Sequence, residues 1–345
     1  MSADVTGSEN AACLGLDWGT SSLRACLLDA GGAIIGQRAS DAGITNVGGG
    51  EFDAALQRVA GDWLKRQPDL KIIASGMIGS RQGWVEAPYA ECPAGAEDVA
   101  NALIHLRAGS GHEIAFVPGV KITAADGMPD VIRGEETQIF GALNSSPGAA
   151  AARAPNSSTS PPRTQGLFVL PGTHSKWAWV SASKIVSFAT FMTGEVFDVL
   201  RRHSILGRQM NDPAHSADIL ENNEPWCRGV EYGLSRASGS GGVLKRLFST
   251  RTLGLFGELE PAGAHDYLSG LLIGSEVREA LACMAGDEAP GAAPEEVVVV
   301  GDSALSDRYE RALHAASVKA VRGPADAASR GHWSIARAAG LIAHS

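Results

Sequence analysis

The chain has 345 residues, of which 44% are hydrophobic and 19% charged, with a formal net charge of −9 at pH 7. These values describe a soluble, globular chain that is long enough for a large core and fits two domains better than one. The sequence has no basic cluster of the kind that binds nucleic acid. No apolar run approaches the ~20 residues of a membrane helix and no export signal starts the chain, so we expect a cytoplasmic protein without a membrane anchor.

The first predicted element is a β-hairpin with a polar tip. An apolar strand at 13–17 ends on Asp17, and a second strand follows at 23–28. The turn between them consists of small and hydroxyl-bearing residues: Gly19, Thr20, Ser21 and Ser22. Backbone N–H groups and hydroxyls can surround a phosphate, and a carboxylate beside them requires an intervening divalent cation. The tip therefore indicates a Mg²⁺-nucleotide site, although the same turn also occurs in ordinary hairpins.

The next elements alternate strands with helices. Further strands are predicted near 33–37, 71–74 and 114–118, and a helix near 52–66. A segment rich in Ser, Pro, Ala and Gly then occupies 144–165 without apolar periodicity, and we expect a disordered, dispensable insertion there. This pattern is typical of an α/β protein with an interruption near its middle.

A second hairpin of similar design follows the insertion. A buried-looking strand at 167–170 leads into the turn Pro171-Gly172-Thr173-His174-Ser175-Lys176, and the strand pattern resumes at 177–180. Two such hairpins, one in each half of the chain, fit a nucleotide clamped between two related domains.

The last predicted elements belong to the second half. A fully apolar strand at 297–300 ends on Gly301 and Asp302, where a nucleoside can approach the backbone closely. An amphipathic helix follows, and the segment 333–342 is a helix of small residues suited to tight packing at a hinge. We expect His332 and Trp333 to begin this helix.

The cysteines indicate a reducing environment. There are five of them, far apart in the chain and without C-x-x-C spacing: Cys13, Cys26, Cys92, Cys227 and Cys283. This pattern favours reduced thiols over disulfides or a zinc site.

The order of these elements resembles the superfamily of sugar kinases, hexokinase, actin and heat-shock chaperone ATPases. Within it, five strings resemble 2-dehydro-3-deoxygalactonokinases, and the similarity extends from about residue 13 to 342: 16–24, 75–84, 117–120, 133–138 and 170–177. The resemblance implies a two-domain actin-like ATPase (ribonuclease H-like) α/β fold, with mixed sheets flanked by helices and ATP in a cleft between the domains.

The resemblance also implies domain boundaries. We expect a disordered N-terminus at 1–12, an N-terminal actin-like domain with the sugar-acid-binding loop at 13–143, the insertion at 144–165, and a C-terminal actin-like domain with nucleotide-binding elements at 166–345.

The implied reaction is transfer of the γ-phosphoryl group of ATP to the C6 hydroxyl of 2-dehydro-3-deoxy-D-galactonate, with Mg²⁺ as cofactor. Asp17 is the expected metal residue, acting through water. The phosphate-binding candidates are the two hairpin turns and neighbouring cations: Gly19, Thr20, Ser21, Arg24, Gly172, Thr173, His174 and Lys176. Arg24 is equally well explained as a solvated strand residue, and Lys176 as cover for the Trp177 ring. Gly301 and Asp302 are expected at the nucleoside.

Phosphoryl transfer also calls for a carboxylate near the attacking hydroxyl. Glu135 and Glu136 follow Gly134 at a predicted helix start, and Glu135 stands where related carbohydrate kinases carry an aspartate. Asp198 is the reserve candidate. Either glutamate could instead stabilise the helix N-terminus, and Asp198 could instead hold a substrate hydroxyl.

The substrate is an anion, and the glycine-rich loop 79–84 offers a receptor for it. Arg81 suits a bidentate contact with a carboxylate, Ser80 can donate a hydrogen bond, and Trp84 can form an apolar wall. Arg81 can also be read as a surface charge on a mobile loop.

Alternatives to the 2-dehydro-3-deoxygalactonate reaction remain at this stage. The chain could phosphorylate an epimeric acid such as 2-dehydro-3-deoxygluconate, or act as an ATP-driven switch of the same superfamily. The expected partners are a small sugar acid and ATP, and the sequence leaves the oligomeric state open, with a homodimer among the options.

Overall fold

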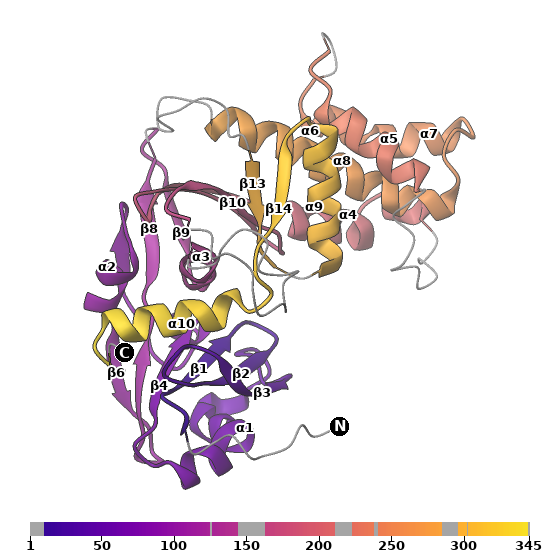
Figure 1. Cartoon of the computed structure of the whole chain (residues 1–345). Coiled ribbons are helices and arrows are strands. Elements are labelled where there is room, and N and C mark those ends of the chain that lie inside the picture. Colours follow the sequence, from indigo (N-terminus) through magenta and orange to yellow (C-terminus); the bar gives the residue numbers. More distant parts are fainter. Residues whose placement is uncertain are drawn as a thin grey trace. The chain divides into compact units, whose positions relative to one another are not determined.

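The computed structural model describes residues 10–124, 126–143, 163–210, 223–237, 241–284, 296–301 and 303–343 (Figure 1). The chain divides into two compact units, which we call unit 1 and unit 2. Unit 1 comprises Met1–Gln165, Val180–Ser187 and Gly323–Ser345, and unit 2 comprises Gly166–Trp179 and Phe188–Arg322.

Unit 1 is built on a mixed six-stranded sheet with strand order β3-β2-β1-β4-β7-β6. Strand β1 pairs antiparallel with β2 and parallel with β4, so the first hairpin forms as predicted. The strands are β1 (Cys13–Trp18), β2 (Leu23–Leu28), β3 (Ile34–Ser40), β4 (Lys71–Ser75), β6 (Ile104–Arg107) and β7 (Glu113–Phe116). A small second sheet contains β5 (Tyr89–Glu91), β8 (Gly119–Thr123) and β9 (Pro129–Ile132).

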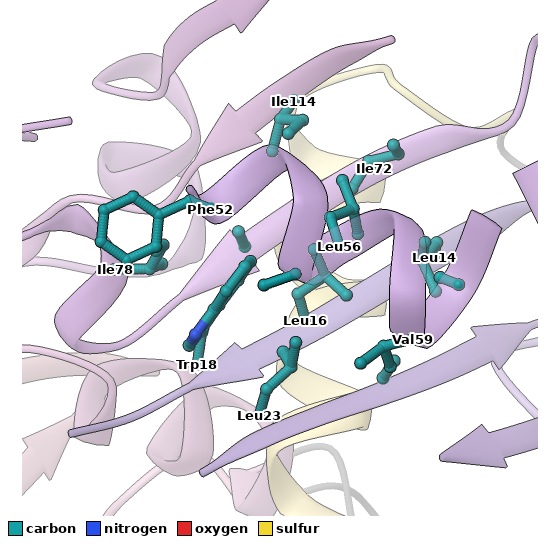
Figure 2. Close-up of a cluster of buried hydrophobic side chains, with 14 of the residues drawn as sticks. Leu14, Leu16, Trp18, Leu23, Phe52, Leu56, Val59, Ile72, Ile78 and Ile114 are labelled. Carbon is teal, nitrogen blue, oxygen red and sulfur yellow. The ribbon is translucent and has the colours of Figure 1, made fainter. Parts of the chain in front are cut away.

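Alternation along β1 determines which helices cover the sheet. Leu14, Leu16 and Trp18 point to one face, where they pack against the amphipathic helix α1 (Phe52–Arg66) in the main core of unit 1 (Figure 2). Cys13, Gly15 and Asp17 point to the other face because side chains alternate along a strand. That face carries α10 (Ala327–Ala338), shown in yellow beside the indigo strands in Figure 1.

Helix α10 packs closely on α3 (Glu135–Leu143), and glycine permits the contact. A Cβ on Gly331 would lie 1.8 Å from the Thr137 carbonyl oxygen, and one on Gly141 would lie 1.8 Å from that of Ala327. The two helices therefore touch backbone to backbone. The described part of unit 1 also contains α2 (Ala96–Asn101) and the 3₁₀ turns η2 (Gly48–Gly50) and η3 (Met77–Gly79).

Unit 2 contains most of a five-stranded sheet with order β12-β11-β10-β13-β14. Its strands are β10 (Gly166–Leu170), β11 (Ser175–Ser181), β12 (Lys184–Phe191), β13 (Glu296–Val299) and β14 (Lys319–Arg322). Its helices are α4 (Thr193–His203), η4 (Gly207–Gln209), α5 (Glu224–Leu234), α6 (Val243–Leu247), α7 (Ser249–Leu255), α8 (Pro261–Met284) and α9 (Ser303–Ala315). Strand β13 is buried and pairs parallel with both β10 and β14, as its continuous apolar sequence predicts.

The structure corrects three predictions of organisation. Residues 323–345 belong to unit 1, not to a C-terminal domain 166–345, because α10 packs on β1 and α3. Ala11 is buried and the Ala12 N–H donates to the Leu28 carbonyl, so the folded part starts before residue 13. Helix α10 begins at Ala327, which places His332 inside the helix and not at its start.

Other expectations concern residues that are only partly described. The predicted insertion 144–165 lies outside the described residues except for 163–165, and the predicted N-terminal segment except for 10–12. All five cysteines are described, and each is a free thiol. Among the helices of the described residues, none has both the length and the apolar character needed to cross a bilayer.

Candidate active site

The first hairpin turn in unit 1 is held from one side by its carbonyl groups. The backbone N–H groups of Ile44 and Thr45 donate to the carbonyls of Gly19 and Thr20, both at 3.1 Å. Asn46 Nδ2 donates to the Ser21 carbonyl at 3.2 Å. Within the described residues, the hydroxyls of Thr20 and Ser21 have no hydrogen-bond partner, and both residues are exposed. The Gly19 N–H donates to the Ser22 carbonyl at 2.9 Å, so the hydroxyls of Thr20 and Ser21 are the donors that the turn can offer to an anion.

Asp17 lies next to this turn, near the end of β1. Its side chain is 23% exposed, and Arg24 Nη1 on the paired strand lies 4.0 Å from the carboxylate. Burial raises the pKa of the Asp17 carboxyl, and the Arg24 charge opposes that shift only in part. The Arg24 side chain is mostly exposed, which agrees with its interpretation as a solvated strand residue. A partly desolvated carboxylate with one weakly placed cation is a favourable position for a divalent ion held through water.

Glycine backbones bring three segments of unit 1 together beside Asp17. A Cβ on Gly76, directly after β4, would lie 2.8 Å from the Trp18 carbonyl oxygen. A Cβ on Gly134, directly before α3, would lie 3.1 Å from the Gly76 Cα. Both glycines have positive φ, +90° and +109°, a region that other residues rarely occupy. The end of β1, the start of the 77–84 loop and the start of α3 therefore meet backbone to backbone.

The two glutamates at the start of α3 have different environments. Glu136 is fully buried, and its carboxylate accepts hydrogen bonds from the Gly134 N–H at 2.6 Å and from Thr137 Oγ1 at 3.0 Å. Burial, followed by the charge of Glu135, raises the pKa of Glu136 to about 7. Glu135 is only half-buried, and its Oε2 accepts the Arg133 N–H at 2.8 Å. Glu136 thus serves the helix start, whereas Glu135 is the less buried of the two carboxylates.

The predicted sugar-acid loop is anchored by packing more than by polar contacts. Ser80 Oγ donates to the Met77 carbonyl at 2.7 Å. Trp84 is half-buried in an aromatic cluster, and its ring centroid lies 6.2 Å from that of Trp18 and 6.0 Å from that of Phe116. The ring therefore packs in the core of unit 1, whether or not it also contacts a ligand. Arg81 is exposed and forms no hydrogen bond or ion pair within the described residues.

Arg133 is a residue of this region that sequence reasoning missed. It precedes Gly134 in the chain, and its Nη2 donates to the Ala87 carbonyl at 2.8 Å. Its guanidinium carbon lies 4.3 Å from the centroid of the Tyr89 ring. The signal available in the sequence was a lone arginine directly before the Gly-Glu-Glu string.

The second hairpin turn, in unit 2, is joined to the start of α4. The Glu195 N–H donates to the Thr173 carbonyl at 3.0 Å. A Cβ on Gly194 would lie 2.5 Å from the Gly172 carbonyl oxygen, so this helix start rests directly on the turn. His174 Nε2 forms a short hydrogen bond with Glu195 Oε2. Thr173 and His174 are exposed, and the turn offers them to a ligand.

Two other predicted residues of unit 2 are engaged elsewhere. Lys176 is buried within β11, where its Nζ donates to Thr190 Oγ1 at 2.8 Å. Asp198 forms ion pairs with Arg201 at 3.1 Å and Arg202 at 2.8 Å on its own helix. The phosphate role of Lys176 and the reserve base role of Asp198 stay predictions, and these contacts give each residue a structural task.

A buried polar network lies under the second turn. The Glu276 carboxylate accepts hydrogen bonds from Trp177 Nε1 and from the Tyr309 hydroxyl, both at 2.7 Å, and Ser175 Oγ is 2.7 Å from the same hydroxyl. Burial raises the pKa of Glu276, and its hydrogen bonds, first that from Thr193, oppose the shift. The network fixes the strand that leaves the turn.

A pocket of about 170 Å³ adjoins this turn within unit 2. Its lining includes Gly172, Thr193, Phe197, Ser269, Arg308 and Tyr309. Gly301 follows β13, the parallel neighbour of β10, and a Cβ on it would lie 3.7 Å from the Pro171 carbonyl oxygen. The predicted nucleoside glycine is therefore beside the predicted phosphate turn, and Asp302 lies outside the described residues.

Each unit thus presents a polar turn at the end of a strand in a mixed sheet flanked by helices, and the two together define a two-domain actin-like α/β fold. A model of the 2-keto-3-deoxy-galactonokinase family matches residues 17–335. The chain belongs to this family.

Individual relatives cover almost the whole chain. The 2-dehydro-3-deoxygalactonokinase of Escherichia coli (strain K12) is 33% identical over 312 residues, which are 90% of this chain and 92% of the relative. A Rhizobium meliloti (strain 1021) protein, provisionally named as the same kinase, is 32% identical over 328 residues, 92% of this chain and 96% of the relative. The crystal structure of a Sinorhizobium meliloti protein, provisionally described likewise, has a TM-score of 0.73 at 32% identity and covers 94% of this chain and 98% of that one.

Proposed function

We propose that the protein transfers the γ-phosphoryl group of ATP to the C6 hydroxyl of 2-dehydro-3-deoxy-D-galactonate, giving the 6-phosphate. Membership of the 2-keto-3-deoxy-galactonokinase family supports the reaction. The structural observation that carries it is the meeting of Trp18, Gly76 and Gly134, which gathers Asp17, the 77–84 loop and Glu135 in one place.

The first turn is proposed to receive the transferring phosphate. The unpartnered hydroxyls of Thr20 and Ser21 would supply donors, Gly19 would allow the phosphate to approach the backbone closely, and Arg24 can add positive charge from the paired strand. Asp17 would hold Mg²⁺ through water, because its desolvated carboxylate gains from a cation. Bound Mg²⁺ neutralises charge on the β- and γ-phosphates during transfer.

Glu135 is proposed as the group that orients and deprotonates the C6 hydroxyl. It is the half-buried member of the glutamate pair, and the Arg133 N–H, an uncharged donor, helps to orient its carboxylate. Glu136 has its oxygens committed to Gly134 and Thr137. Ser80, Arg81 and Trp84 are proposed to contact the sugar acid from the loop.

Unit 2 is proposed to bind the remainder of ATP. Gly172, Thr173 and His174 would contact the phosphates, with Glu195 holding the His174 ring. Gly301 and the pocket beside the turn would accept the nucleoside. We propose a cytoplasmic enzyme with no nucleic-acid or membrane partner, and a homodimer is one option for its assembly.

The test is ADP release from Mg-ATP with a panel of acceptors. The panel contains 2-dehydro-3-deoxy-D-galactonate, its gluconate epimer, the corresponding unoxidised aldonates and neutral hexoses. We expect strong preference for the first compound. Preference for the epimer would reassign the substrate, and ATP binding without turnover on any acceptor would favour an ATP-driven switch.

A further inference from the structure

Arg133 carries a positive charge that the described residues do not neutralise. No carboxylate among them forms an ion pair with it, and its Nε and Nη1 atoms are buried without a hydrogen-bond partner. Only Nη2 is engaged, with the Ala87 carbonyl. Buried guanidinium N–H groups are normally paired, because leaving them unpaired after removal from water costs free energy. An unpaired guanidinium of this kind is suited to an anion that the chain itself does not provide.

The position of Arg133 is that of a substrate contact. Its Nη1 is 3.2 Å from the point that a Cβ on Gly79 would occupy, so the free side of the guanidinium faces the start of the proposed sugar-acid loop. Its backbone N–H binds Glu135, the proposed base. One residue therefore touches both the loop and the carboxylate that would act on the hydroxyl.

The aromatic ring of Tyr89 strengthens this arrangement. It lies against the guanidinium at 4.3 Å, and the contact holds the plane of the guanidinium in one orientation. Arginine held in this way loses little side-chain freedom when it forms a charge-assisted hydrogen bond with a carboxylate. Arg81, in contrast, is exposed and has no contact that fixes its side chain within the described residues.

We propose that Arg133 binds the C1 carboxylate of the sugar acid and is the main determinant of preference for an acid over a neutral sugar. The inference rests on the proposed kinase function and adds a residue to it. Nη1, which is buried without a partner and faces Gly79, supplies the charged donor to the carboxylate, and binding requires the 77–84 loop to move outward at Gly79. Arg81 contributes from the loop surface, with a smaller effect on this preference.

The experiment compares the acid with an otherwise identical neutral acceptor. The full-length enzyme and the variants Arg133→Met, Arg133→Lys and Arg81→Met are assayed by ADP release with 2-dehydro-3-deoxy-D-galactonate and with its C1 carboxamide. The readout is the ratio of kcat/KM for the acid to that for the carboxamide. Because both acceptors meet the same enzyme preparation, a loss of folded protein cancels in the ratio.

We expect Arg133→Met to lower kcat/KM for the acid by about 10- to 100-fold, mainly through KM, as loss of a charge-assisted contact does. The carboxamide should change by less than about 3-fold, Arg133→Lys should be intermediate, and Arg81→Met should keep most of the ratio. The KM for ATP should stay unchanged in all three variants.

Two results would overturn the assignment in distinguishable ways. If Arg133→Met lowers both acceptors by the same factor, Arg133 only supports the loop through Ala87 and Tyr89, and the kinase function stands. If Arg81→Met abolishes the ratio and Arg133→Met keeps it, the carboxylate is bound by Arg81. An inactive wild-type enzyme with both acceptors would instead refute the proposed function, and this inference with it.

Discussion

His332 gives a pH dependence of stability whose size can be worked from the structure. It lies in α10, 1% exposed, with Nε2 2.8 Å from Ser75 Oγ, and its Nδ1 is 2.7 Å from the point that a Cβ on Gly15 would occupy. Burial is the single cause that lowers its pKa from 6.5 to about 4. The unfolded chain therefore binds a proton on this ring below pH 6.5 that the native state refuses until about pH 4.

The sign and magnitude follow from this difference in proton binding. The contribution of His332 to the free energy of unfolding should fall as the pH falls from 6.5 to about 4, and be constant outside that window. A difference of about 2.5 pKa units, at about 1.36 kcal/mol each, corresponds to about 3 kcal/mol. Buried carboxyls with raised pKa values, among them Glu136 at about 7, act in the opposite direction, so the wild-type curve alone does not isolate the effect of His332.

A variant isolates the contribution of His332. His332→Gln keeps a polar group opposite Ser75 but does not titrate. Urea unfolding of both proteins between pH 4 and 8 gives the difference in unfolding free energy, in which the contributions of the carboxyl groups cancel. We expect the unfolding free energy of the wild type, relative to that of His332→Gln, to fall by about 3 kcal/mol on going from pH 7 to pH 4. A difference constant to within about 1 kcal/mol would refute the reasoning that His332 is buried and neutral.

Three further predictions concern the site and its support. Glu135→Gln should keep ATP binding and lower kcat by about 100-fold or more, as loss of a positioned base does. Glu136→Gln should lower kcat less, and the reverse order of the two effects in steady-state assays would exchange the roles of the two glutamates. Gly331→Ala should destabilise unit 1 by about 3 kcal/mol or more in urea unfolding, because the new Cβ would strike the Thr137 carbonyl, whereas Gly48→Ala, in open space, should not; equal effects would refute the close helix contact. His174→Asn should raise the KM for ATP by about 10-fold and leave that for the sugar acid unchanged; a change confined to the acid would remove His174 from the nucleotide site.

Local sequence was sufficient for most individual elements. The first hairpin, α1 and the buried strand β13 form where apolar alternation, helical periodicity and a continuous apolar run predict them. These features depend on neighbours along the chain, so a single sequence contains them. The limits of α10 were less predictable, because Ala and Gly carry little periodic signal before Trp333.

The assignment of α10 to unit 1 depended on contacts distant in sequence. Gly331 is nearly 200 residues from Thr137, the residue whose carbonyl it touches. Nothing in the local pattern distinguishes a helix that packs on its own half of the chain from one that returns to the other half. The predicted C-terminal domain 166–345 was therefore wrong at its end.

The candidate site shows the same division between local and distant information. The polar turns and the Gly-Glu-Glu string were visible in the sequence, and the structure gathers the unit 1 candidates through Gly76 and Gly134. Sequence could not separate Glu135 from Glu136, because their burial depends on how α3 faces the rest of unit 1. Arg133 was overlooked because its significance comes from missing partners, which only a structure reveals.

The position of the phosphate on the product tests the central claim most directly. Wild-type enzyme is incubated with Mg-ATP and 2-dehydro-3-deoxy-D-galactonate, and the product is analysed by ³¹P NMR with proton correlation and by mass spectrometry. The account predicts one phosphate per molecule of ADP formed, with phosphorus coupled to the C6 protons. Phosphate on another hydroxyl, or ADP released together with inorganic phosphate and unchanged sugar acid, would contradict it.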